Sequence, residues 1–201
     1  MSAPVEQLER EIETGLREAL TFFAGDRLLL WEIAESRREA ILTHYQSEAG
    51  SEPPVTFHLH ETLPYIFDRI LSFQNLFVSH LDDLPPAACV DRQYLKQADI
   101  RSFLLIPLLV GGAPRGALSL VCTRAGRSWN NADLFDFQRI GTVLAGALDR
   151  LRSHGLIDHR IRFETMVADV SACIVKAQPD EIDSEIERGL ARAAQFFQAD
   201  R

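Results

Sequence analysis

The chain has 201 residues, which is enough for one large domain or for a domain of about 150 residues with an additional segment. Its 46% hydrophobic and 25% charged residues are typical of a globular protein. The net charge of −8 argues against a nucleic-acid surface, and no apolar run reaches the roughly 18 residues of a membrane helix. Three widely spaced cysteines and the lack of a signal-peptide pattern predict a reducing, cytoplasmic location.

The first half of the chain predicts an amphipathic helix, a hairpin and then shorter elements. Apolar residues recur every three or four positions over 4–24, as expected of a helix with one buried face, and Gly25 is a typical helix end. Strands over 27–33 and 39–46 form the hairpin, and the glycine and prolines of 47–54 predict a loop. The elements that follow are a helix over 62–73, a strand over 76–79 and a helix over 87–98.

The second half predicts another hairpin and a long helix. Strands over 102–110 and 113–123 are joined by Gly111-Gly112, a two-residue turn that favours a hairpin. Asn130 or Asn131 is the expected N-cap of the long helix. Its apolar stripe weakens near Gly155, which predicts a kink or a bistable connector, and 178–180 break the helix. Two hairpins with interspersed helices predict an α+β fold with an antiparallel sheet.

An internal repeat is visible without any comparison. Residues 11–27 read EIETGLREALTFFAGDR and residues 185–201 read EIERGLARAAQFFQADR, with ten of 17 positions identical. The first copy leads into the strand at 27–33. We therefore expect 178–201 to be the first helix of a truncated second copy. The alternative is a C-terminal helix that swaps into a partner chain.

Several segments together resemble a known family. Leu84-Pro85-Pro86 precedes a helix, a strand contains Ile106-Pro107-Leu108, the next strand reads GALSL from Gly116, and Trp129-x-x-x-Asp133 opens the last helix. These segments resemble the second half of a GAF domain, and FFxxDR before a Trp-bearing strand resembles its start. The resemblance implies a GAF- or PAS-like antiparallel sheet of about five to six strands, flanked by helices and followed by a long C-terminal helix.

The resemblance also implies an organisation and a role. We expect a GAF domain at 1–151, a linker helix at 152–177 and the start of the second GAF domain at 178–201. Such domains occur in multi-domain signalling proteins of the sensor histidine kinase type in two-component systems. They relay a small-molecule or conformational signal through a dimeric helical linker to an output domain. A homodimer through the N- and C-terminal helices is expected, and a ligand-free dimerisation scaffold is the alternative.

GAF domains often hold a ligand between the sheet and the helices over it, so the resemblance implies a pocket. Its lining would be mostly apolar, which favours a small-molecule ligand, whose identity stays unknown along with any cofactor. The alternative is a filled core without a ligand. The candidate lining residues are Phe57, Phe67, Val78, His80, Tyr94, Leu104 and Ser119.

Other constellations offer little chemistry. His58 and His60 could share one face of a strand, but nothing clearly completes the three or four ligands of zinc, so no metal site is predicted. Cys89 invites comparison with GAF-fold methionine sulfoxide reductases, whose cysteine spacing and surrounding pattern differ, so a thiol-dependent reductase is kept only as a further alternative. Asp99-Ile100-Arg101 replaces the Asp-Ile-Pro element of bilin-binding phytochromes, and the cyclic-nucleotide signature of phosphodiesterase GAF domains is not recognisable. We therefore predict no catalytic residue and no enzymatic activity within this segment.

Overall fold

The computed structural model describes residues 5–33, 39–48, 56–176 and 182–199. The chain divides into two compact units, Met1–Asp149 and Arg150–Arg201. The division falls within one helix, α5, which spans Asn131–Lys176. The two units are described separately.

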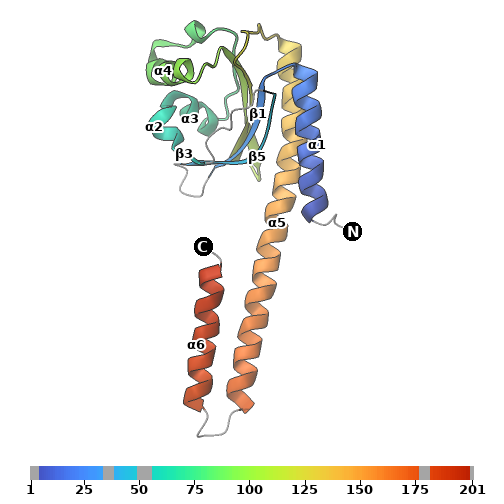
Figure 1. The fold of residues 1–201 in the computed structure, drawn as a ribbon, viewed down its shortest axis with the longest axis vertical. Helices are drawn as coiled ribbons and strands as arrows, with labels where there is room; N and C mark the ends of the chain where they lie inside the picture. Colours follow the sequence, from blue (N-terminus) through green and yellow to red (C-terminus); the bar gives the residue numbers. More distant parts are fainter. Residues whose placement is uncertain (1–4, 34–38, 49–55, 177–181, 200–201) are drawn as a thin grey trace. The chain divides into compact units, whose positions relative to one another are not determined.

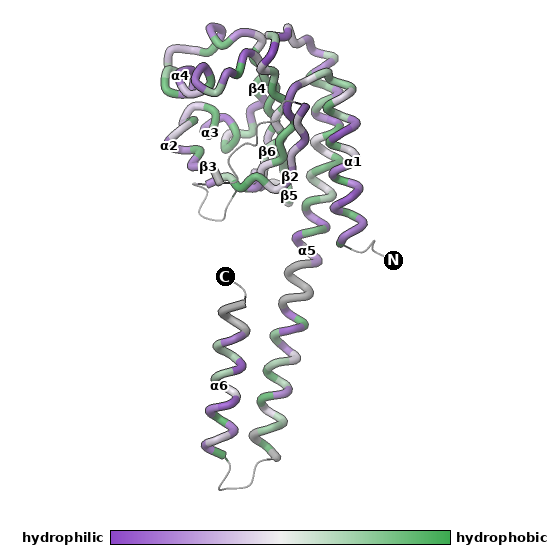
Figure 2. Tube along the Cα trace, in the orientation of Figure 1, coloured by the Kyte–Doolittle hydropathy of each residue, from purple (hydrophilic) through white to green (hydrophobic). Residues whose placement is uncertain are grey.

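Unit 1 contains a six-stranded sheet in which every neighbouring pair is antiparallel. This confirms the predicted α+β fold with its antiparallel sheet. In spatial order the strands are β3 (Thr56–Phe57), β2 (Ala40–Ser47), β1 (Arg27–Ile33), β6 (Ala113–Cys122), β5 (Ser102–Val110) and β4 (Leu76–Val78). Figure 2 shows that the central strands β5 and β6 are largely hydrophobic, as expected of strands buried on both faces.

Helices cover both faces of this sheet (Figure 1). One face carries α1 (Val5–Phe23) and the beginning of α5. The other face carries α2 (Leu59–Thr62), α3 (Pro64–Leu71) and α4 (Cys89–Gln97), together with 3₁₀ turns at Leu81–Asp83 and Pro86–Ala88. The side chains of each strand therefore alternate between two separate apolar layers.

The layer beneath α1 and α5 is closely packed. Phe23 of α1 and Phe137 of α5 are fully buried and meet edge to face, with ring centroids 5.4 Å apart. A Cβ atom on Gly141 of α5 would lie 2.2 Å from the Cδ1 atom of Ile106, so this glycine allows the helix to approach β5. The side chains of α1 and α5 therefore form a closely packed core with one face of the sheet.

Local signals in the sequence are mostly confirmed. The Asn130 side chain accepts hydrogen bonds from the backbone N–H groups of Ala132 and Asp133, which makes it the N-cap of α5. Gly111 and Gly112 have φ values of 60° and 77°, as the predicted tight turn requires. The backbone of α5 stays helical through Gly155, where the sequence predicted a kink or a bistable connector.

Two elements had no counterpart in the sequence prediction. Strand β3 has two residues and pairs only with Ala40 and Ile41 at the edge of β2, and α2 has four residues. Neither is long enough to display a helical or strand period. The predicted loop at 47–54 lies mostly outside the described residues, as does the predicted break at 178–180.

Gly116 is required by the packing of the central strands. A Cβ atom at this position would lie 2.4 Å from the backbone oxygen of Trp31 on β1. Because a backbone atom cannot swing aside, Gly116→Ala should destabilise the protein by about 3 kcal/mol in urea unfolding. The matched control is Gly15→Ala in α1, where an added Cβ meets nothing within 4 Å. That helical change should be neutral or stabilising by up to about 1 kcal/mol; equal losses for the two variants would contradict this packing argument.

Unit 2 consists of the last part of α5 and α6 (Ile182–Ala199), which lie side by side in opposite directions (Figure 1). They touch where Gly189 of α6 meets Val170 of α5, since a Cβ on this glycine would lie 2.8 Å from the Val170 Cγ1 atom. Gly189 is the one buried residue among those of unit 2 whose burial the structure describes. Across the described helices of both units, none has the length and apolar character to cross a membrane.

Candidate functional site: a cavity over the sheet

A cavity of about 380 Å³ lies between the sheet and helices α2, α3 and α4. Its volume falls within the range of about 300–1,000 Å³ that is usual for small-molecule sites. Most of its wall is apolar. The sheet contributes Leu29, Phe103, Leu105, Ala117 and Val121, and the helices contribute Leu59, Ile66, Ile70 and Leu95, with Leu63 between α2 and α3.

Strand alternation determines which residues reach this cavity. Leu29 and Trp31 of β1 line it, so Leu28 and Leu30 point to the layer beneath α1. The same rule assigns Phe103 and Leu105 of β5 to the cavity. The wall is therefore built from every second residue of the three central strands β1, β6 and β5.

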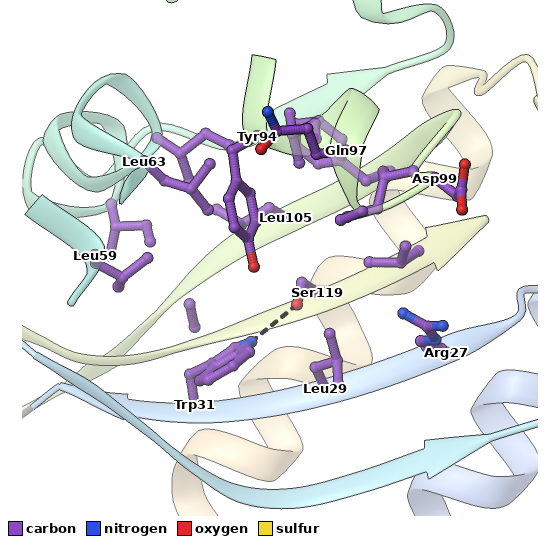
Figure 3. A pocket seen from close by; sticks show the side chains of 18 residues that line it. Arg27, Leu29, Trp31, Leu59, Leu63, Tyr94, Gln97, Asp99, Leu105 and Ser119 are labelled. Atoms are coloured by element: carbon purple, nitrogen blue, oxygen red, sulfur yellow. Dashed lines mark hydrogen bonds between the residues drawn. The ribbon is translucent and has the colours of Figure 1, made fainter. Parts of the chain in front are cut away.

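A polar group interrupts the apolar floor. The Trp31 Nε1–H donates a hydrogen bond to the Ser119 Oγ atom, at a distance of 3.1 Å. Figure 3 shows the Tyr94 ring descending from α4 with its hydroxyl toward these two residues. Ser119 is buried, and burial raises the pKa of the Tyr94 hydroxyl above its ordinary value. Both hydroxyls are therefore neutral near pH 7 and can donate or accept hydrogen bonds.

The cavity has a second, more polar end. Arg27 at the start of β1 and Asp99 after α4 lie together at one end of the group of lining side chains, whereas Leu59 and Leu63 lie at the other (Figure 3). Gln97 also belongs to the lining. Asp99 has a φ of 55°, the left-handed conformation that aspartate tolerates better than most residues. The site thus combines a long apolar wall with hydrogen-bonding groups at the middle and one end.

Asp91 joins the two helices that cover the cavity. This α4 side chain is completely buried, and its carboxylate accepts hydrogen bonds from the backbone N–H groups of Tyr65 and Ile66 at 3.2 and 2.9 Å. These donors belong to the first turn of α3, where N–H groups have no partner within the helix. Asp91 therefore caps α3 from a neighbouring helix and fixes the cover of the cavity.

The structure brings together only some of the residues that the resemblance implied. Tyr94 and Ser119 line the cavity. Phe67 and Val78 are buried in the apolar cluster on the same side of the sheet, outside the cavity lining. His80 lines a separate, more open depression beside Asp82 and Lys96.

The last two candidate lining residues, Leu104 and Phe57, are not found in the cavity lining. Leu104 does not line the cavity; it lies on the opposite face, because its neighbours Phe103 and Leu105 occupy the cavity side. Ile106, two residues after Leu104 in β5, points to the same opposite face, where it packs against Gly141 of α5. The Phe57 side chain lies outside the described residues, although its backbone pairs with Ala40.

Sequence reasoning missed Arg27, Trp31, Asp91 and Asp99. In the antiparallel register Ser119 lies opposite Leu29 of β1, so their side chains point to the same face of the sheet. Trp31 stands two residues after Leu29 and therefore points to that face as well, so this pairing would have predicted it as a lining residue. Asp91 had no comparable signal. It stands in the middle of a polar helix, and its role depends on a helix 25 residues earlier in the chain.

The cysteines and histidines are not gathered at this site. Cys89 is exposed at the start of α4, Cys173 belongs to unit 2, and Cys122 is buried, with burial raising the pKa of its thiol. None of the three lines the cavity. His58 lies 3.4 Å from Glu39 in an exposed pair. Within the described ranges, no group of three or more His, Cys, Asp or Glu residues could hold a metal ion.

With this geometry in place, the class of the protein follows from comparison. The GAF domain family matches residues 7–148, which is most of unit 1. The chain therefore belongs to the GAF domain family. No curated protein sequence matches it significantly.

Solved structures show the same fold at low sequence identity. GAF3 from Slr1393 of Synechocystis sp. PCC6803, in its photoproduct state, is 19% identical with a TM-score of 0.61, covering 75% of this chain and 98% of that one. JSC1_58120g3, a far-red absorbing protein with bound biliverdin IXa, is 18% identical with a TM-score of 0.62 and coverages of 74% and 94%. A GAF domain region from Geobacter sulfurreducens PCA is 21% identical with a TM-score of 0.58 and coverages of 71% and 93%.

Proposed function

We propose that unit 1 is a sensory, non-catalytic GAF domain that binds a small molecule in the cavity over the sheet. The cavity itself carries this proposal, because it is a partly open, mostly apolar cavity with a few convergent polar groups, the usual composition of a ligand site. Membership of the GAF family and the ligand-binding fold relatives support it. In a scaffold without a ligand, side chains would be expected to fill more of this cavity of about 380 Å³.

The lining favours a compact, mostly apolar ligand with a hydrogen-bonding group at its middle and a polar end. Ser119 and Tyr94 would contact that group at the middle of the cavity, and Arg27 would favour a negative or strongly polar end. A tetrapyrrole like that of the biliverdin-bound relative is a poorer fit. The volume is near the lower limit for ligand sites, and no cysteine lines the wall for covalent attachment.

Filling the cavity tests this proposal. Ala117 is buried in the floor, so Ala117→Leu would occupy ligand space, whereas Ala132→Leu makes the same change at an exposed position of α5. The low-molecular-mass fraction of an extract of the source cells should raise the melting temperature of the wild type and of Ala132→Leu by several degrees. Ala117→Leu should show no rise. No shift in any of the three proteins, or the same shift in all, would refute cavity binding.

The finer part of the proposal is a relay through α5 toward an output domain, such as a histidine kinase. Helix α5 begins against the sheet and continues to Lys176 without interruption, so displacement of its first turns can be transmitted along its axis. Leu151→Pro would break the helix beyond the GAF domain. We expect ligand addition to alter hydrogen exchange at 160–176 in the wild type and not in Leu151→Pro. Hydrogen exchange in 7–148 should be the same in the two proteins. An unchanged ligand response at 160–176 in the variant would contradict the relay.

We also propose that the domain works as a homodimer through α1 and α5. Their side chains Phe22, Phe135 and Val143 are large, apolar and exposed, so a partner that covers them would remove apolar surface from water. Light scattering should give twice the chain mass for the wild type and the single-chain mass for Phe22→Ser combined with Val143→Ser. A wild-type monomer at 100 μM, or a dimer unaffected by the two substitutions, would exclude this interface.

A further inference from the structure

Two charged side chains belong to the cavity lining, one of each sign, and both lie at the same end. Arg27 at the start of β1 carries the positive charge, and Asp99 just after α4 carries the negative charge. Asp99 and Ile100 line both the cavity and the neighbouring open depression, so they stand where the cavity reaches the surface. Figure 3 places Leu59 and Leu63 at the opposite end. We call Arg27 and Asp99 the charged mouth.

The two charges come from opposite walls of the cavity, and the backbone holds each of them. Arg27 begins β1 in the floor, where it pairs with β2 on one side and β6 on the other. Asp99 ends α4 in the cover. Its N–H donates a hydrogen bond to the Lys96 carbonyl at 3.2 Å, and the N–H of Ile100 donates to the Leu95 carbonyl at 2.9 Å. A group bound at the charged mouth therefore meets a cation from the floor and an anion from the cover.

The Asp99 carboxylate is available to a ligand. Within the described part of the chain it forms no hydrogen bond or ion pair, whereas Asp82 in the neighbouring depression pairs with Lys96 at 3.3 Å. Arg101 lines that depression and does not line the cavity. Because Asp99 is exposed, water can solvate its carboxylate while the cavity is empty, which avoids the cost of burying an unpaired charge.

Opposite charges at one mouth disfavour a ligand with a single charge. A lone carboxylate is attracted by Arg27 and repelled by Asp99, and a lone amine experiences the reverse. A head group with both charges can place its carboxylate against Arg27 and its ammonium against Asp99. Each contact is then a charge-assisted hydrogen bond, and the forked N–H donors of a guanidinium match a carboxylate in geometry.

We propose that the cavity ligand is a zwitterion with an apolar body, of the type and size of an apolar α-amino acid. Its body lies along the apolar wall toward Leu59 and Leu63, and its head group lies at the charged mouth, where it stays partly hydrated. The cavity of about 380 Å³ suits one such compact molecule. The inference rests on ligand binding in the cavity and adds the class of the ligand, with Asp99 as the residue that selects it.

Matched analogues separate the contributions of the two charges. Phenylalanine, tyrosine and tryptophan are each compared at pH 7 with the amine that lacks the carboxylate and with the acid that lacks the ammonium. The amines are phenethylamine, tyramine and tryptamine, and the acids are 3-phenylpropionate, 3-(4-hydroxyphenyl)propionate and 3-indolepropionate. Isothermal titration calorimetry with the whole chain measures each dissociation constant. For at least one body, the wild type should bind the amino acid at least about tenfold more tightly than either analogue.

Neutralising Asp99 tests its role in this preference. Asp99→Asn removes the negative charge and keeps a side chain that tolerates the left-handed backbone at this position. It should weaken binding of the best amino acid about tenfold, whereas the corresponding acid should bind equally well or more tightly because its repulsion is lost. A general defect in folding would weaken both compounds alike. Asp82→Asn is the matched control, because it makes the same change of charge outside the cavity lining and should bind as the wild type does.

Three results would overturn the proposal: an amine or acid that binds the wild type as tightly as its amino acid, no binding of any of the amino acids, or an unchanged preference in Asp99→Asn. Failure of the proposed function is recognised separately. The shift in melting temperature caused by the cell extract, and its loss in Ala117→Leu, report whether the cavity is occupied whatever the charge of the ligand. Such a shift without binding of the amino acids would reject the zwitterion and retain the ligand-binding domain.

Discussion

Replacing Asp91 by alanine should destabilise unit 1 by about 3 kcal/mol and abolish ligand binding in the cavity. The completely buried carboxylate accepts hydrogen bonds from two N–H groups in the first turn of α3. Alanine would leave both donors unpaired in an apolar environment, and hydrogen bonds to a charged acceptor are each worth about 1.5–3 kcal/mol. Urea unfolding measures the loss of stability.

The effect on the cavity follows from the position of the two helices. Ile66 and Ile70 of α3 and Tyr94 and Leu95 of α4 line the cavity, so loosening α3 from α4 opens its cover. Asp82→Ala is the matched control, because Asp82 forms an exposed pair with Lys96 and should contribute less than about 0.5 kcal/mol. A loss below about 1 kcal/mol for Asp91→Ala would show that this cap does not hold the two helices together.

Replacing Asp26 should have a comparable effect that depends on pH. This buried side chain follows α1 and accepts hydrogen bonds from the backbone N–H groups of Thr123 and Arg124, at 2.6 and 2.9 Å, and from the Arg124 guanidinium. It therefore ties the junction of α1 and β1 to the end of β6. Asp26→Ala should cost about 2 kcal/mol at pH 7, because two partly buried backbone donors lose a charged acceptor.

The direction of the pH dependence follows from the pKa of Asp26. Burial alone would raise this pKa, but the hydrogen bonds from Arg124 and Thr123 outweigh it, and the pKa lies below the ordinary value of 3.8. The folded state therefore prefers the charged form, and the stabilisation is present above about pH 4 and declines as the pH falls through the lowered pKa. The difference in unfolding free energy between wild type and Asp26→Asn should shrink between pH 5 and pH 2. A constant difference over that range, or an equal effect of Glu48→Ala, which removes the exposed partner of Arg124, would contradict this account.

The fold was predictable from the sequence because its signals are local and periodic. The stripe of α1, the Gly111-Gly112 turn and the Asn130 cap each lie within a few residues of the structure that they specify. Leu104 shows where this reasoning stops. Its apolar character suits either face of a strand buried on both sides, so only the register with β4 and β6 places it beneath the helices rather than in the cavity.

The candidate site was predictable to a smaller extent. Tyr94 and Ser119 were implied by the resemblance, and both line the cavity. Arg27 and Asp99 lie 72 positions apart in the chain, and no pattern in the sequence relates them. Asp91 likewise acts on a helix formed much earlier in the chain. Such residues are brought together by tertiary packing, which periodicity and spacing do not encode.

Native mass spectrometry of protein purified gently from its source cells tests the proposed function most directly. The account predicts that the wild type carries an additional mass of one small molecule per chain, which is released on denaturation. Ala117→Leu, with its cavity filled, should carry none, and Ala132→Leu should match the wild type. The bare chain mass for the wild type, or the same additional mass on Ala117→Leu, would contradict a ligand in the cavity.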